Sequence, residues 1–224
     1  MTTTLEEIRV STSKDPIEQL KKAIVTCDPQ LARSAAQQAV QQGEDPLKAL
    51  DAMTQAIRVV GNAFSAGELW LPDLVGAAEA MSAAAPTIEE EIARRGARRE
   101  SLGIVVIGTV YGDIHSIGKT MVATLLEAEG FEVHDLGIDV TAEEFVEAVK
   151  AREAHILAMS ALLTSTAPEQ RKVIEALKKQ GIRDKVKIMV GGGAITAAFA
   201  ESIGADGYDP TAPGAARLAR RLLA

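Results

Sequence analysis

The chain has 224 residues, of which 47% are hydrophobic and 25% charged, and its net charge of −7 argues against a nucleic-acid partner held by a basic surface. A single cysteine, Cys27, excludes an internal disulfide and favours a reducing compartment. No apolar run approaches the roughly 20 residues of a membrane span, and the polar N-terminus is unlike a signal peptide. These features predict a soluble cytoplasmic protein with no nucleic-acid or membrane partner.

The first part of the chain has the composition of a helical domain. Residues 1–14 are polar and are predicted to be disordered, whereas residues 15–96 carry apolar side chains at helical spacing. An aspartate followed by a proline opens a helix at "CDPQ" and again at "QQGEDPL", and "SAGELWLPDL" separates two further helical stretches. We expect a bundle of four antiparallel helices. Four arginines are expected to form only a solvated helix end and a linker: Arg94, Arg95, Arg98 and Arg99.

Residues 97–224 have a different pattern, in which short β-rich runs alternate with amphipathic helical segments. The five runs are "LGIVVIG" (102–108), "FEVHDLG" (131–137), "HILAMS" (155–160), "VKIMVGG" (186–192) and "ADGYDP" (205–210). The helices between them are expected to begin near Ile117, Thr141, Pro168, Ala194 and Pro213. This alternation predicts an α/β domain with a five-stranded parallel sheet that binds its ligand at the carboxyl ends of the strands.

The loop after the first predicted strand, "GTVYGDIHSIGKT" (108–120), combines glycines with an aspartate and a histidine. A phosphate-binding loop has the spacing G-x-x-x-x-G-K-[ST], and the stretch from Gly112 to Gly118 is one residue too long. A carboxylate and an imidazole would also stand where backbone amides should surround an anion. The pattern G-x-G-x-x-G is absent too, so nucleotide binding is disfavoured.

His115 follows Asp113 at a spacing that suits metal ligation, because an imidazole that binds a metal usually donates its other N–H to a carboxylate. The two remaining histidines, His134 and His155, fall within or at the start of predicted strands. A zinc site made only of protein ligands is therefore disfavoured. Two interpretations remain: a metal whose other ligands come from a macrocycle, or a loop histidine that bonds its neighbouring carboxylate and does nothing more.

Three motifs in this order resemble the cobalamin-binding domain shared by methionine synthase, the corrinoid methyl-carrier proteins and the adenosylcobalamin mutases. The signature D-x-H-x-x-G, S-x-L and G-G is matched by Asp113-Ile114-His115-Ser116-Ile117-Gly118, by Ser160-Ala161-Leu162 and by Gly191-Gly192. The resemblance extends through "LWLPDLVGAAEAM" and covers nearly the whole chain from about residue 15. It implies a helical cap domain (15–96) and a flavodoxin-like, Rossmann-like cobalamin-binding domain (97–224), as in the small corrinoid proteins of methyltransferase systems for methanol, methylamines, betaines or aryl methyl ethers.

The resemblance also implies roles for individual residues. His115 would be the lower axial ligand of cobalt in place of the dimethylbenzimidazole of the cofactor, with Asp113 on its other ring nitrogen and Thr166 bonding that carboxylate. Gly112 and Gly118 would leave space around the corrin edge. The residues implied around the displaced nucleotide tail are Ser160, Leu162, Thr164, Gly191, Gly192 and Ala212.

Two further positions complete the implied site. Trp70 and Leu71 would cover the upper face of cobalt from the helical domain. Ser116 stands where methyl carriers commonly have aspartate, and Ile117 begins the predicted helix; both belong to the cofactor-binding motif. Serine and aspartate are both good N-caps, so the backbone role is expected to survive while the charge near cobalt changes.

The function implied by the resemblance is that of a methyl carrier. Cobalt(I) of cobalamin would accept a methyl group from a donor bound to a substrate-specific methyltransferase, and a second methyltransferase would pass it from methylcobalamin to tetrahydrofolate or a thiol. A reductive activase is a further candidate partner, and the chain alone would not be a complete enzyme. The alternative is a cobalamin-dependent sensor or regulatory module, or a cobalamin-storage module. A mutase subunit is disfavoured because it would lack the segment "LWLPDLVGAAEAM".

Overall fold

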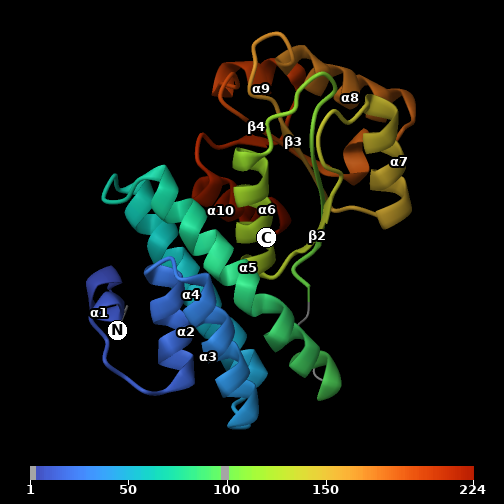
Figure 1. The fold of residues 1–224 in the computed structure, drawn as a ribbon. Helices are drawn as coiled ribbons and strands as arrows, with labels where there is room; N and C mark the ends of the chain where they lie inside the picture. Colours follow the sequence, from blue (N-terminus) through green and yellow to red (C-terminus); the bar gives the residue numbers. More distant parts are fainter. Residues whose placement is uncertain (1–3, 97–100) are drawn as a thin grey trace. The chain divides into compact units, whose positions relative to one another are not determined.

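The computed structural model describes residues 4–96 and 101–224, which form two compact units divided after residue 100 (Figure 1). The predicted domain boundary after residue 96 differs by four positions, 97–100, which lie outside the described residues. No helix of the described residues is both long and apolar enough to cross a membrane.

The N-terminal unit is helical, and the four helices expected between residues 15 and 96 are present. Its helices are α1 (Leu5–Arg9), α2 (Pro16–Val25), α3 (Pro29–Gln41), α4 (Pro46–Ser65) and α5 (Leu71–Arg94). Asp15, Asp28 and Asp45 each accept a hydrogen bond from a first-turn backbone N–H, and each precedes a proline at the first helical position. The core between the helices is made of buried aliphatic side chains, including Leu20, Ile24, Met53, Ile57, Leu74 and Ile88.

The prediction of disorder over residues 1–14 is wrong for the segment of α1. Thr4 and Glu7 form a reciprocal capping box at the start of this helix, which satisfies two of its free backbone donors. Ile8 is buried in the described structure, and Lys22 of α2 donates to the backbone carbonyl of Ser11 at 2.6 Å. A single buried apolar residue in a polar stretch is too weak a signal for sequence analysis to detect.

The expectation of a merely solvated arginine cluster is also wrong in part. Arg94 and Arg95 both donate at 2.6 Å to Glu91, whose side chain is almost fully buried at the end of α5. The hydrogen bond from Arg94 contributes most to lowering the pKa of Glu91, and with the bond from Arg95 it lowers this pKa to about 2. Arg98 and Arg99 lie outside the described residues.

The C-terminal unit has the predicted parallel sheet with helices on both faces. Its strands are β1 (Ile104–Thr109), β2 (Glu132–Asp135), β3 (Ile156–Ser160), β4 (Lys187–Gly191) and β5 (Gly207–Tyr208), in the order β2-β1-β3-β4-β5. Its helices are α6 (Ile117–Glu129), α7 (Ala142–Arg152), α8 (Ala167–Lys179), the short 3-10 helix η1 (Arg183–Lys185), α9 (Ala197–Ile203) and α10 (Ala212–Leu223). This strand order is that of the flavodoxin-like fold, as the sequence predicted.

The helices of this unit form two layers (Figure 1). Helices α7, α8 and α9 pack on one face of the sheet over a core that includes Phe145, Ile174 and Ile203, whereas α6 packs with α10. The ring of Phe145 lies against Gly108 of β1, where a Cβ would come within 2.8 Å of the ring. The chain passes from β1 to β2 on one side, whereas β3 lies on the other side of β1, so the topological switch point of the sheet lies between β1 and β3.

Candidate functional site

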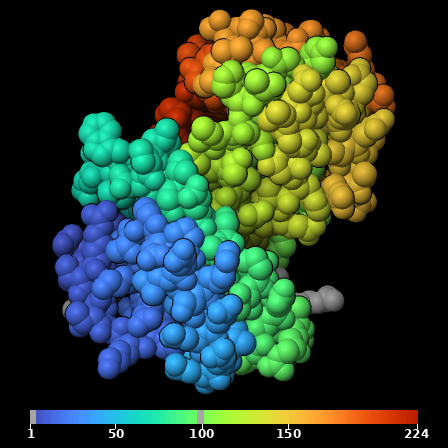
Figure 2. All heavy atoms as spheres, viewed as in Figure 1, coloured from blue at the N-terminus to red at the C-terminus, as the bar shows by residue number. Residues whose placement is uncertain are grey.

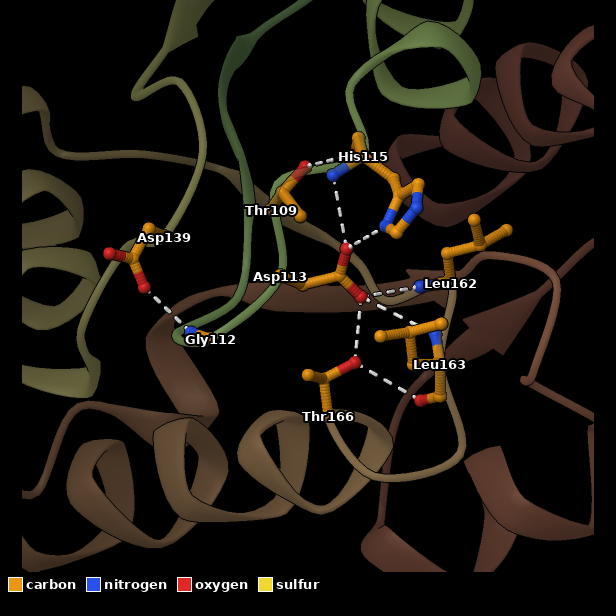
Figure 3. A network of polar contacts seen from close by, with 8 residues as sticks. All are labelled: Thr109, Gly112, Asp113, His115, Asp139, Leu162, Leu163 and Thr166. Carbon is orange, nitrogen blue, oxygen red and sulfur yellow. Dashed lines mark hydrogen bonds and ion pairs between the residues drawn. The ribbon is translucent and has the colours of Figure 1, made fainter.

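The loop after β1 carries a buried carboxylate that holds the histidine two residues later (Figure 3). Oδ1 of Asp113 accepts hydrogen bonds from the backbone N–H of His115 at 3.1 Å and from its ring Nδ1 at 2.7 Å. Asp113 is fully buried, yet the side chain of His115 remains 46% exposed. The carboxylate therefore anchors a ring whose far edge is open to a ligand.

The other oxygen of this carboxylate connects the loop to the segment after β3. Oδ2 of Asp113 accepts from the hydroxyl of Thr166 at 2.6 Å and from the backbone N–H groups of Leu162 at 2.8 Å and Leu163 at 3.4 Å. Thr166 is the N-cap residue of α8, but its hydroxyl is directed at Asp113 instead of the helix backbone. Two loops some fifty residues apart thus converge on one carboxylate.

These donors determine the charge of Asp113. Burial raises its pKa, but the hydrogen bonds from Thr166 and His115, with that from Leu162, outweigh burial and hold the pKa well below its usual range. An ionised carboxylate only accepts hydrogen bonds, so Nδ1 of His115 carries the ring hydrogen. In the neutral ring with its hydrogen on Nδ1, Nε2 carries the lone pair that a metal binds.

The backbone of the histidine loop is held from two further directions. The hydroxyl of buried Thr109, at the end of β1, donates to the carbonyl of His115 at 3.0 Å. The carboxylate of Asp139, in the loop after β2, accepts from the N–H of Gly112 at 2.6 Å. Sequence analysis assigned neither residue a role, since their partners in the histidine loop are known only once the sheet has formed.

A buried cation lies one helical turn after the histidine. Lys119 of α6 is almost fully buried, although a positive charge near a helix N-terminus is unfavourable. It forms an ion pair with Asp135 at the end of β2, and the second oxygen of Asp135 accepts from the N–H of Gly137 at 2.8 Å. Helix α6 is therefore tied to the loop that also carries Asp139.

The sheet register brings the three sequence motifs to one edge. Ser160 at the end of β3 pairs with Thr109 of β1 on one side and with Gly191 of β4 on the other. Within the described residues, a Cβ on Gly191 would meet a single atom, the carbonyl oxygen of Asp209 at 4.0 Å, so space is open beside it. Gly192 differs, because its φ is +117° and a Cβ there would overlap the backbone of Ala161. The structure therefore requires Gly192 for its own backbone, whatever passes beside it.

The first residues of α6 depart from one expectation. Ser116 occupies the N-cap position, but its side chain makes no capping hydrogen bond, because the backbone is already in the right-handed helical region. Ile117 begins the helix as predicted, and its side chain is exposed. A Cβ added at Gly118 would have no atom of the described chain within 4 Å outside its own helix backbone, so the surface at the helix start is open.

Large apolar side chains are exposed at the same end of the sheet as the histidine. Six of them are exposed, five in the loops after β1, β2 and β3 and one at the first position of α6: Tyr111, Ile114, Ile138, Leu162, Leu163 and Ile117. In the space-filling view the lime-green segment that contains Tyr111 and Ile114 reaches the surface of this unit (Figure 2). Such a collection of apolar side chains on a surface indicates a binding site for a large, partly apolar ligand.

The remaining predicted residues are distributed as follows. Thr164 lies exposed in the loop between β3 and α8, and Ala212 begins α10 directly after β5, so both are at the same strand-end edge. Trp70 and Leu71 lie in the other unit, at the start of α5, and are exposed. Gln170, which sequence analysis missed, is buried and donates to the carbonyls of Met159 and Gly191, bridging β3 and β4. The sequence feature that could have revealed Gln170 is its position, as a polar residue, on the otherwise apolar face of α8.

Comparison with known families identifies both units. Residues 103–217 match a B12 binding domain, and residues 16–87 match a second family that is also described as a B12 binding domain. The chain belongs to the family of B12-binding corrinoid proteins. Its cofactor is cobalamin, with cobalt at the centre of the corrin ring, as the sequence predicted.

Curated relatives of this corrinoid protein match it over most of their length. It is 40% identical to dimethylamine corrinoid protein 2 of Methanosarcina mazei over 214 residues, which are 96% of this chain and 100% of the relative. It is 43% identical to the trimethylamine corrinoid protein of Methanosarcina barkeri over 91% of this chain and 94% of the relative.

Solved structures give the same result. The corrinoid protein resembles a chain of the methanol:cobalamin methyltransferase complex MtaBC from Methanosarcina barkeri with a TM-score of 0.82 and 30% identity, over 100% of this chain and 86% of that chain. It also resembles a cobalamin-binding protein from Desulfitobacterium hafniense with a TM-score of 0.72 and 28% identity, over 92% of this chain and 98% of that one.

The residues at the strand ends fit a corrinoid. His115 presents Nε2 on the exposed side of its ring, the surface at Gly118 and Gly191 is open, and apolar side chains are exposed in the loops at the same end of the sheet. The described residues contain no group of three or more His, Cys, Asp or Glu side chains that could hold a metal ion. A single protein ligand beside an apolar surface suits a metal whose other ligands belong to a macrocycle.

Proposed function

We propose that this corrinoid protein carries a methyl group between two methyltransferases, on a cobalamin whose cobalt would be bound by His115. When bound, cobalamin supplies a cobalt centre that can accept a methyl group and release it to another acceptor. The observation that carries the proposal is the Asp113–His115 pair, with the ring held at Nδ1 and its far edge exposed at Nε2. The names of the relatives, as corrinoid proteins for methylated amines and as a methyltransferase complex, support the methyl-carrying part.

The chain's own contribution is to hold the ligand and control its proton. Asp113 keeps the Nδ1 hydrogen of His115 in place, while the hydroxyl of Thr166 stabilises the carboxylate as an anion. A histidine whose backbone carbonyl and partner carboxylate are both anchored needs little reorganisation to bind cobalt. The pair would therefore hold the cobalt of cobalamin through Nε2 of His115.

Other residues would accommodate the parts of cobalamin that lie away from the metal. Gly112, Ser116, Ile117 and Gly118 would contact the corrin edge, and Trp70 and Leu71 would shield the upper face. The nucleotide tail would pass the strand ends at Ser160, Leu162, Thr164, Gly191, Gly192 and Ala212. Open space beside Gly191 and the exposure of Thr164 support this path.

The partners follow from the chemistry of a carrier. A substrate-specific methyltransferase would load the methyl group, and we propose a small methylated amine as its donor, since the relatives at 40% identity or more include dimethylamine and trimethylamine corrinoid proteins. An acceptor methyltransferase would unload it to tetrahydrofolate or a thiol, and a reductive activase would restore the reduced cofactor. The free thiol of Cys27 suits a reducing cytoplasm.

The test is reconstitution with cobalamin followed by visible spectroscopy of the wild type and His115→Ala. We expect the wild type to bind cobalamin with its dimethylbenzimidazole displaced, and His115→Ala to lose the histidine-bound spectrum. His134→Ala is a matched control, because His134 also bonds a carboxylate two residues earlier, Glu132, at 2.8 Å. An unchanged spectrum in His115→Ala would overturn the ligand assignment.

A second measurement tests methyl transfer. The reduced, loaded protein is incubated with a methylamine methyltransferase and its methylated amine, and methylation is followed by the visible spectrum. Stable cobalamin binding without methyl transfer to or from any methyltransferase offered would instead identify a storage or sensory module.

A further inference from the structure

The loop between β2 and α7 is hydrogen-bonded to the histidine loop, and Figure 3 shows the contact between Asp139 and Gly112. The carboxylate of Asp139 accepts from the N–H of Gly112 at 2.6 Å, and the N–H of Asp139 donates to the carbonyl of Asp113 at 3.0 Å. The next residue, Val140, forms a parallel bridge with Val110. One residue of the second loop therefore brackets the peptide segment immediately before the histidine.

The backbone of Asp139 is in a conformation that needs a reason. Its φ is +57°, in the left-handed region that residues with a side chain rarely adopt, although Asn and Asp tolerate it better than most. Glycine would take this conformation without strain but would supply no acceptor. Aspartate satisfies both requirements, because its side chain reaches Gly112 from this backbone position.

The same loop also holds the other side of the histidine. Asp135, at the end of β2 just before this loop, forms an ion pair with Lys119, four residues after His115. Asp139 holds the residues that precede His115. The hydrogen bonds of Asp139 within the described chain reach the site only through the backbone of Gly112 and Asp113. Its effect on the site must therefore act through the position of the histidine loop.

We propose that Asp139 is a positioning residue that holds the histidine loop in its ligating conformation before cobalamin binds. This inference rests on the proposed role of His115 as the cobalt ligand. Removal of the Asp139 carboxylate frees the N–H of Gly112 and lets the Asp113–His115 segment sample other conformations. The protein would still fold and bind corrinoid, but fewer molecules would have histidine on cobalt.

Three variants separate the carboxylate from the backbone effect. Asp139→Gly removes the acceptor and suits the positive φ, whereas Asp139→Asn suits the same φ and keeps an oxygen that accepts from Gly112. Glu153→Gly is the matched control, since Glu153 is an exposed acidic residue with a φ of +49° at the end of α7. Both substitutions to glycine relieve the strain of a positive φ, and Asp139→Asn keeps it. Only Asp139→Gly loses the hydrogen bond from the N–H of Gly112.

The measurements are made on the full chain, without and with cofactor. Amide hydrogen exchange of the cofactor-free protein reports the order of residues 110–116. Electron paramagnetic resonance of bound cob(II)alamin, in protein labelled with nitrogen-15 histidine, distinguishes histidine from dimethylbenzimidazole as the lower ligand. Asp139→Gly should speed exchange in this segment and lower the ratio of histidine-bound to histidine-free cobalamin, each about tenfold, as expected for one charge-assisted hydrogen bond. Asp139→Asn should restore most of both values, and Glu153→Gly should match the wild type.

The outcomes distinguish the inference from the function on which it rests. A wild-type signal that does not respond to nitrogen-15 histidine would refute histidine ligation and the inference with it. A labelled wild-type signal with unchanged exchange and ligation in Asp139→Gly would overturn the positioning role alone. Equal losses in Asp139→Gly and Asp139→Asn, or in Glu153→Gly, would also overturn it, since the acceptor oxygen would not be the cause.

Discussion

Thr166 donates its hydroxyl to the buried carboxylate of Asp113 at 2.6 Å, across 53 positions of the chain. The bond joins the N-cap residue of α8 to the loop after β1. The same carboxylate also accepts a hydrogen bond from the ring of His115. A helix on one face of the sheet is thereby linked to the histidine at the edge of the sheet. This link is open to direct test by substitution at Thr166.

Thr166→Val keeps the shape of the side chain but removes the donor, and we expect it to destabilise the folded protein by about 2 kcal/mol at pH 7. Because the folded pKa of Asp113 lies below its unfolded value, the stabilisation is present above the unfolded pKa and is lost as the pH falls toward the folded one. The difference between variant and wild type should therefore shrink in acid. Urea unfolding across this pH range measures it, and Thr166→Ser, which retains the hydroxyl, should remain close to the wild type.

Gly192 and Gly118 should respond differently to alanine. Gly192→Ala places a methyl group into the backbone of Ala161 at a φ of +117° and should cost about 3 kcal/mol or more. Gly118→Ala meets no described atom within 4 Å beyond its own helix backbone and should gain about 0.5 kcal/mol from helix propensity. If cobalamin uses the space at Gly118, this variant will be slightly more stable than the wild type and yet bind cobalamin more weakly. Thermal unfolding and cobalamin titration of both variants decide the point, and unweakened binding by Gly118→Ala would exclude contact there.

Glu91 provides a test of the helical unit by itself. Glu91→Gln loses the charge that pairs with Arg94 and Arg95, and we expect a lower unfolding temperature at pH 7. The pKa of Glu91 is lowered from 4.5 to about 2, so its stabilisation is fully present above pH 4.5 and disappears as the pH falls through about 2. Thermal unfolding of both proteins as a function of pH checks this, and a difference that persists at the lowest pH would show that the charge is not responsible.

Trp70 is the only tryptophan and is 77% exposed, which makes the proposed lid measurable by fluorescence. In cofactor-free protein, iodide should quench its emission efficiently. If Trp70 covers the upper face of cobalt, bound cobalamin should reduce its accessibility to iodide several-fold, while Trp70→Phe should leave stability within about 0.5 kcal/mol. An accessibility that does not change on cobalamin binding would contradict the lid assignment.

Local sequence signals accounted for the secondary structure well. Aspartates before prolines at Asp28 and Asp45 marked helix starts because an N-cap and its first turn are only a few residues apart. The alternation of apolar runs and amphipathic segments predicted the parallel sheet because each run and each segment is recognised from a few neighbouring residues. Short elements differ from the prediction: the segment of α1 is predicted to be disordered but is helical, and β5 is only the two residues Gly207–Tyr208 of the predicted 205–210. Such short elements depend on contacts with distant residues more than on their own sequence.

The sequence by itself determined the helix and strand pattern and the Asp113-x-His115 pair, whose partners are two residues apart. Only the tertiary structure decided what surrounds that pair. The register of Thr109, Ser160 and Gly191, the bond from Thr166 and the tether at Asp139 all join segments that are distant in sequence. Parallel strands meet through long crossovers, so their ends become neighbours only after the sheet has formed. A motif can therefore indicate the proposed ligand residue, but the fold determines how its side chain is oriented and how firmly it is held.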